Sequence, residues 1–141
     1  MGNLWAESNI CSIRLQGDFS SGYATSVDYT KKVDNGTISK SAFVNNGPNG
    51  GGYGLAQWTY YTRKQALYEY AKSKNASIGD LQMQLEFLMM ELSSSYPSVL
   101  AVLRTSNDVG ACAEVVLLKF ERPANMHSKI GDRTGFARKY L

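Results

Sequence analysis

Residues 2–8 read Gly-Asn-Leu-Trp-Ala-Glu-Ser, and residues 52–59 read Gly-Tyr-Gly-Leu-Ala-Gln-Trp-Thr. The first segment is predicted to form the last turns of a helix, which places the carboxylate of Glu7 beside Leu4 and Trp5. Apolar surroundings disfavour the ionised form of a carboxyl group. A Glu in such surroundings can keep its proton and donate it to a leaving oxygen. The alternative is a surface carboxylate, but the negative end of a helix dipole is an unfavourable place for one.

A glycine-rich stretch leads into the second segment. Five of the ten residues at 45–54 are glycines, which lets a backbone approach a ligand closely. The stretch does not match a phosphate-binding loop, because no Gly-Lys-Ser/Thr follows it. Tyr53 lies between two glycines, which predicts an exposed ring in contact with a ligand. Packing explains Gln57 less readily, so its amide is a candidate for contact with a ligand, and Trp58 is predicted to be partly core.

Apolar spacing predicts a mainly helical chain with a small β-hairpin or irregular insert over residues 10–26. Helices are expected over residues 1–9, 27–33, 59–74 and 77–94, from Pro97, from Asn107 or Asp108 to Phe120, and over 132–140. The apolar face of the fourth of these is formed by Leu81, Leu85, Leu88, Met89 and Leu92. Met89 and Met90 are expected in the core, and Tyr60 and Tyr61 are expected to serve in packing.

The composition limits the classes of function. A length of 141 residues fits one compact domain, and the net charge of +3 is too diffuse to predict binding of nucleic acid. No apolar stretch is long enough to span a membrane. A single histidine, His127, and the absence of a Cys-x-x-Cys motif argue against a metal site. Whether Cys11 and Cys112 pair is left open, although a buried thiol is favoured for Cys112.

No signal peptide is visible at the start of the chain, which instead resembles the end of a helix. We interpret the chain as an excised domain or a trimmed fragment.

The two segments together resemble the phage tail lysozyme domain, which is found in phage tail proteins and endolysins. They are more distantly similar to goose-type lysozymes and soluble lytic transglycosylases. Glu7 and Ser8 match a Glu-Ser pair that closes a helix in those enzymes, and residues 54–57 match a Gly-Leu-Met-Gln turn with Ala in place of Met. Further matches lie at residues 63–67, 95–97 and 120–124. The resemblance covers nearly the whole chain.

The resemblance implies an α+β lysozyme-like fold over residues 1–141 and an enzyme that cleaves bacterial peptidoglycan. The bond would be the β-1,4 link between N-acetylmuramic acid and N-acetylglucosamine, with Glu7 as general acid and no metal or cofactor. The enzyme would act on the cell wall, either virion-associated, released at lysis or secreted. The substrate-binding candidates are Ser8, Tyr53, Gln57, Trp58 and Glu121. Two of these keep a structural alternative: Ser8 as a hydroxyl that satisfies a helix-end carbonyl, and Glu121 as an ion-pair partner that fixes a helix end.

A second catalytic carboxylate is not evident. Glycosidases that invert or retain the sugar configuration use two carboxylates, and the candidates here are Asp18, Asp28 and Asp34. Related domains often carry an Asp before the Gly-Tyr-Gly turn, where this chain has Asn45, Asn46 and Asn49. Lytic transglycosylases use one Glu, because the 6-hydroxyl of the sugar itself attacks. The sequence leaves hydrolysis and transglycosylation open, and it leaves a non-catalytic wall-binding or phage structural module as the main alternative.

Overall fold

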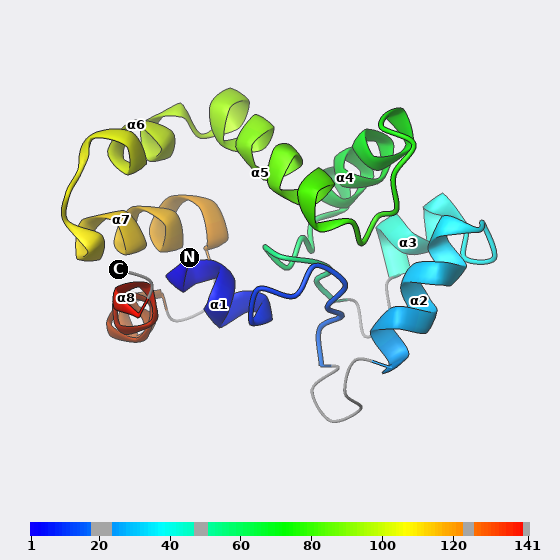
Figure 1. Ribbon diagram of the computed structural model, residues 1–141, viewed down its shortest axis with the longest axis horizontal. Helices are drawn as coiled ribbons and strands as arrows, with labels where there is room; N and C mark the ends of the chain where they lie inside the picture. Colours follow the sequence, from blue (N-terminus) through cyan, green and yellow to red (C-terminus); the bar gives the residue numbers. More distant parts are fainter. Residues whose placement is uncertain (18–23, 47–50, 123–125, 140–141) are drawn as a thin grey trace. The chain divides into compact units, whose positions relative to one another are not determined.

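The computed structural model describes residues 1–17, 24–46, 51–122 and 126–139, and these are mainly helical, as predicted (Figure 1). The α-helices among them are α1 (Gly2–Ser8), α2 (Ala24–Asp34), α3 (Lys40–Asn46), α4 (Tyr61–Ser73), α5 (Leu81–Ser95), α6 (Pro97–Thr105), α7 (Val109–Val116) and α8 (Ile130–Arg138). A π-helical turn, Leu117–Glu121, continues from α7, and a 3-10 turn, Met126–Lys129, precedes α8. The chain divides into two compact units, one formed by Met1–Ile10 with Leu88–Leu141 and the other by Cys11–Phe87.

The predicted β-hairpin over residues 10–26 is not present in the part of the chain that the structure describes. Instead, Leu15 forms an isolated antiparallel bridge with Tyr53 of the glycine-rich turn. The amide of Gln16 donates to the carbonyl of Gly52 at 2.9 Å, and the amide of Gly54 donates to the carbonyl of Arg14 at 2.8 Å. The backbone of this segment therefore finds its partners in a distant turn and not in a neighbouring strand.

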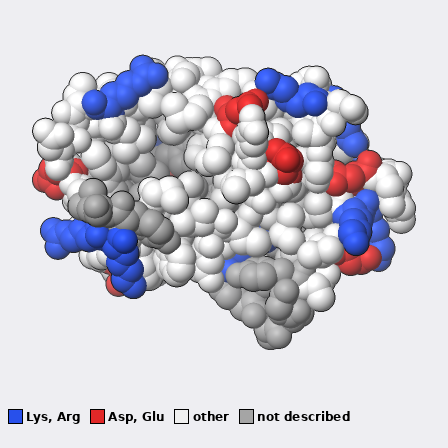
Figure 2. Space-filling view, in the orientation of Figure 1, with Lys and Arg blue, Asp and Glu red and all other residues white. Residues whose placement is uncertain are grey.

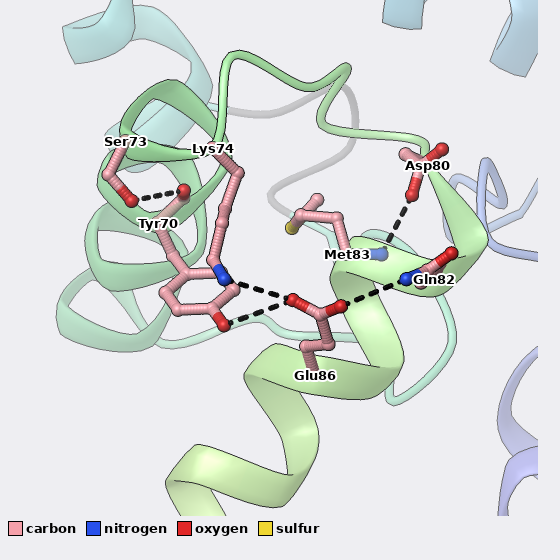
Figure 3. Close-up of polar contacts among 7 residues, drawn as sticks. All are labelled: Tyr70, Ser73, Lys74, Asp80, Gln82, Met83 and Glu86. Atoms are coloured by element: carbon pink, nitrogen blue, oxygen red, sulfur yellow. Dashed lines mark hydrogen bonds and ion pairs between the residues drawn. The ribbon is translucent and has the colours of Figure 1, made fainter.

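Local capping explains the bounds of several helices. Asp108 caps α7 as predicted, because its carboxylate accepts the amides of Gly110 and Ala111. Helix α3 was not predicted, yet Ser39 caps it by accepting the amide of Ala42 at 3.2 Å. Helix α5 begins at Leu81, later than predicted, because the carboxylate of Asp80 accepts the amide of Met83 at 2.7 Å (Figure 3).

A polar cluster links α4 and α5 in the second unit (Figure 3). The carboxylate of Glu86 lies 3.2 Å from the ammonium of Lys74 and accepts hydrogen bonds from the hydroxyl of Tyr70 at 3.4 Å and the amide of Gln82 at 3.1 Å. The hydrogen bonds from Gln82 and Lys74 lower the pKa of Glu86. These groups are solvent-exposed, so we expect the cluster to orient the helices more than to stabilise them.

The predicted buried face of α5 is wrong for Leu81, Leu85 and Met89, while Leu92 is buried as predicted. Leu81, Leu85, Met89 and Met90 are each more than 40% exposed. The side chains that α5 buries include Met83, Gln84, Phe87 and Leu92. Tyr60 and Tyr61 are also exposed, at 69% and 57%, and stack on each other instead of packing in the core. The helix is rotated from the expected face because the amide of Gln84 binds backbone groups inside the second unit.

Candidate active site

Glu7 lies in the last turn of α1 and is paired with a side chain that the sequence did not single out. Its carboxylate forms an ion pair with the guanidinium of Arg133 on α8, and both residues belong to the first unit. The side chain of Glu7 is 19% exposed and that of Arg133 is 7% exposed. The carboxylate is therefore largely shielded from water but still reaches the surface.

The other residues of the first segment, residues 2–8, hold α1 in place. Gly2 lies so close to α8 that a Cβ atom on it would stand 2.2 Å from the carbonyl oxygen of Arg133. The ring of Trp5 lies against that of Phe136, with 6.3 Å between centroids. Asn3 donates its side-chain amide to the carbonyl of Ala113 on α7 at 3.0 Å. These contacts fix α1 against α7 and α8, which lie beside it in Figure 1, and thereby fix the position of Glu7.

Ser8 is fully buried, and its hydroxyl donates to the carbonyl of Leu4 at 3.0 Å. This contact is the one expected if Ser8 satisfies a helix-end carbonyl. Substrate binding by Ser8 stays a prediction.

The glycine-rich turn closes on itself in the second unit. Tyr53 and Trp58 pair across it, with backbone hydrogen bonds of 3.2 and 3.0 Å. Gly54 has a φ of 79° and Gln57 a φ of 47°, so the chain takes the left-handed conformation twice within the turn. The buried amide of Gln84 accepts the amide proton of Leu55 at 2.9 Å. The turn is thus held to α5 by a hydrogen bond as well as closed by its own backbone pairs.

The exposed position expected for Tyr53 is wrong. Its side chain is fully buried, and its ring meets that of Phe43 edge-on with 5.6 Å between centroids. Its hydroxyl lies 2.6 Å from the hydroxyl of Thr30. Burial raises the pKa of Tyr53. The glycines around Tyr53 let its ring enter the core while the backbone turns above it.

Tyr53→Phe is expected to lower the free energy of unfolding by about 1 kcal/mol, the usual net value of one buried hydrogen bond. The ring and its packing are kept, so cleavage of cell walls should not change. Chemical denaturation checks the stability, and a turbidity assay on cell walls checks the activity. Loss of activity with unchanged stability would return Tyr53 to the list of substrate contacts.

Trp58 and Gln57 differ in what they offer a ligand. Trp58 is fully buried, with its ring edge-on to that of Phe87 at 5.4 Å, so it is entirely core and not partly so. Gln57 is half-buried, and its amide nitrogen donates to the carbonyls of Arg14 and Gly54 at 3.1 and 3.0 Å. Its amide oxygen has no hydrogen bond within the part of the chain that the structure describes. Substrate binding by Gln57 stays a prediction.

Glu121 is half-buried and ends the π-helical turn that follows α7. Phe120 beside it is buried against the ring of Tyr96, with 5.1 Å between centroids. Arg122 then takes a left-handed φ of 48°, which ends the turn. Both roles for Glu121, as a substrate contact and as a structural ion-pair partner, remain predictions.

The structure accounts for two of the three candidates for a second carboxylate. Asp28 is exposed on α2 and forms an ion pair with Lys32 at 2.7 Å. The two oxygens of Asp34 accept the amide of Ile78 at 2.9 Å and the hydroxyl of Ser77 at 2.5 Å. Asp34 thus has a structural task in the second unit. Asp18 lies outside the described residues, as does Asn49.

A buried lysine is a feature that sequence reasoning missed. Lys64 of α4 is only 2% exposed, and its ammonium lies 4.7 Å from the centroid of the Phe43 ring. Burial lowers the pKa of Lys64 to about 8. Its charge predicts a side chain that faces outward from the helix over 59–74, and that expectation is wrong. The signal for burial is its position three residues before Leu67, which is also buried.

Lys64 should make stability depend on pH. In the unfolded chain the amine has its usual pKa of 10.5, so between pH 8 and that value only the unfolded state binds the proton. Stability therefore rises with pH in this window, by about 2 kcal/mol between about pH 7.5 and about pH 9.5. The raised pKa values of Tyr29 and Tyr53 act only above the ordinary tyrosine value of 10.

Denaturation curves at these two pH values test this prediction. Lys64→Met should remove the rise, whereas Lys72→Met, which changes an exposed lysine of the same helix, should keep it. A flat profile in the parent protein would mean that Lys64 keeps its proton in the folded state.

The remaining observations concern metal ligands, thiols, membrane spans and surface charge. Among the described residues, no group of three or more His, Cys, Asp or Glu side chains could hold a metal ion. Cys11 and Cys112 are free thiols. No helix in the described ranges is long and apolar enough to cross a membrane. Figure 2 shows the Lys and Arg side chains of one face in separate small groups, with Asp and Glu side chains among them.

Comparison with known proteins identifies a family. A family model described as phage tail lysozyme matches residues 1–141, the whole chain. No curated protein and no solved structure matches.

Proposed function

Because the chain belongs to the phage tail lysozyme family, we propose that it is a glycosidase that cleaves the β-1,4 bond between N-acetylmuramic acid and N-acetylglucosamine in bacterial peptidoglycan. Membership of the family suggests a lysozyme-like peptidoglycan hydrolase in general. The bond and the residues that act on it are our proposal.

One observation carries the proposal: a largely buried carboxylate, that of Glu7, is held at the end of α1 by the residues of the first motif. A fixed position within reach of a substrate is the first requirement of a general acid. The unfavourable place of an acidic side chain at the negative end of a short helix is offset here by the ion pair with Arg133.

In the proposed reaction Glu7 gives its proton to the glycosidic oxygen as the bond from that oxygen to the anomeric carbon breaks. The electron pair of this bond stays with the leaving N-acetylglucosamine. Positive charge develops at the anomeric carbon of N-acetylmuramic acid and is neutralised when a nucleophile bonds to that carbon. Either water or the 6-hydroxyl of the same sugar attacks the anomeric carbon. The proton that this nucleophile loses restores Glu7. Gln57 and Glu121 are the substrate contacts that we retain as candidates, together with Ser8.

We favour a mechanism with one acid and attack by the 6-hydroxyl. Asp34 is engaged in hydrogen bonds and Asp28 in an ion pair, which leaves neither as an evident base. Before the Gly-Tyr-Gly turn, where related domains often carry an Asp, this chain has Asn45 and Asn46. The lack of an Asp at this place also favours the second candidate function, a wall-binding or phage structural module without catalysis.

Digestion of purified cell walls separates these possibilities. The new chain ends are identified by mass spectrometry. A reducing N-acetylmuramic acid end shows hydrolysis, and a 1,6-anhydro end shows transglycosylation. New amines without new sugar ends would show cleavage of the peptide part, as by a cysteine peptidase, and would contradict the proposal. Wall binding with no new ends would identify the non-catalytic module.

A further inference from the structure

We propose that Arg133 is a positioning residue for the catalytic acid, an inference that rests on the proposed role of Glu7. Its guanidinium nitrogen Nη2 donates to Oε1 of Glu7. Within the part of the chain that the structure describes, Oε2 of Glu7 has no hydrogen bond. One carboxyl oxygen is thus anchored to α8, and the other is left to face the glycosidic oxygen of a substrate.

Stability alone does not account for this pair. Arg133 as a residue is 6% exposed, and its Nε atom is buried with no hydrogen-bond partner among the described residues. Removing a guanidinium from water costs free energy, and an unsatisfied donor adds to that cost. Apolar side chains of similar volume would commonly stabilise such a helix contact as well or better. A buried charge that is kept at this cost is explained by a need to hold Glu7.

The backbone of Arg133 also lies against α1. The absence of a side chain at Gly2 lets the carbonyl of Arg133 approach one end of α1, while the guanidinium holds Glu7 at the other end. On α1, Trp5 lies between Gly2 and Glu7, and its ring packs against that of Phe136 on α8. The packing of α1 on α8 therefore determines how the carboxyl group of Glu7 is oriented.

The guanidinium also serves the reaction itself. As the proton leaves Glu7, negative charge develops on the carboxylate, and a positive group already in place stabilises that charge without reorganisation. The other charged side chains of α7 and α8 are Glu114, Asp132 and Arg138, and all three are exposed. Arg133 is thus the positively charged residue of α7 and α8 that forms an ion pair with Glu7.

Kinetics of two substitutions test the proposal. Arg133→Met keeps the length of the side chain and removes the charge, and we expect kcat on cell-wall glycan to fall by about 10²-fold, as for a misplaced catalytic group. KM should stay within about twofold, because Arg133 does not touch substrate. Arg133→Lys restores a charge and should recover part of kcat. Arg138→Met, an exposed arginine of the same helix, is the control and should behave as the parent.

A double-mutant cycle separates this proposal from the proposed function. In the Glu7→Gln background, Arg133→Met should cause no further loss of kcat, because the group that it positions is gone. If Glu7→Gln is inactive but Arg133→Met keeps the parental kcat, the positioning role is wrong and the acid stands. If Glu7→Gln is fully active, the proposed function fails first. Should Arg133→Met not fold, a folded Arg133→Lys variant with parental kcat and KM would equally overturn the proposal, and one with reduced kcat at parental KM would support it.

Discussion

Glu7→Gln is expected to lower the rate of cell-wall cleavage by about 10²- to 10⁴-fold, the usual contribution of a general acid. A glutamine keeps the shape of the side chain, but its amide cannot supply the proton that the leaving oxygen needs. Its side-chain oxygen can still accept the hydrogen bond of Arg133, so the packing of α1 on α8 should survive. The rate is measured from the release of new sugar ends, and circular dichroism checks the fold.

Glu114→Gln provides the matched control, since Glu114 is an exposed carboxylate on α7 in the same unit. It should cleave walls at the parental rate. If the Glu7 variant clears walls as fast as this control, Glu7 is not the acid, and the non-catalytic module or a different active residue must be considered.

Gly54→Val is expected to lower the free energy of unfolding by about 2 to 6 kcal/mol, and wall cleavage with it. Two effects combine. The φ of Gly54 is 79°, a conformation that a β-branched residue tolerates badly. In addition, a Cβ atom at this position would stand 2.6 Å from Oε1 of Gln84. That amide binds Leu55 and the carbonyls of Ser12 and Ile78, so displacing it would break several hydrogen bonds of the second unit.

A second glycine separates the two effects. Gly36 has a φ of 82°, but a Cβ atom there would meet nothing within 4 Å. Gly36→Val should therefore show only the cost of backbone strain, about 1 to 3 kcal/mol. Thermal melting of both variants gives the comparison. Equal destabilisation by the two substitutions would mean that Gln84 moves aside freely and does not hold the turn.

The helical class and much of the element order could be predicted, because both depend on near neighbours in the chain. Apolar spacing located α4, α5 and α6, and Asp108 marked the start of α7. The predictions were wrong where the contacting residues are far apart in the sequence. The segment around Leu15 pairs with Tyr53 and not with a neighbouring strand. The buried face of α5 follows from Gln84, a polar residue that an apolar pattern assigns to the surface.

The candidate site also has a part that local sequence predicts and a part that depends on contacts between distant residues. The sequence by itself determined the family motif, the helix end that carries Glu7 and the turn that carries Gln57, because these are short, contiguous patterns. Only the tertiary structure decided that Tyr53 and Trp58 belong to the core and that Arg133 is the partner of Glu7. The ion pair joins residues 126 positions apart. No local pattern encodes such a contact, because it exists only once α1 and α8 pack at the distance that Gly2 allows.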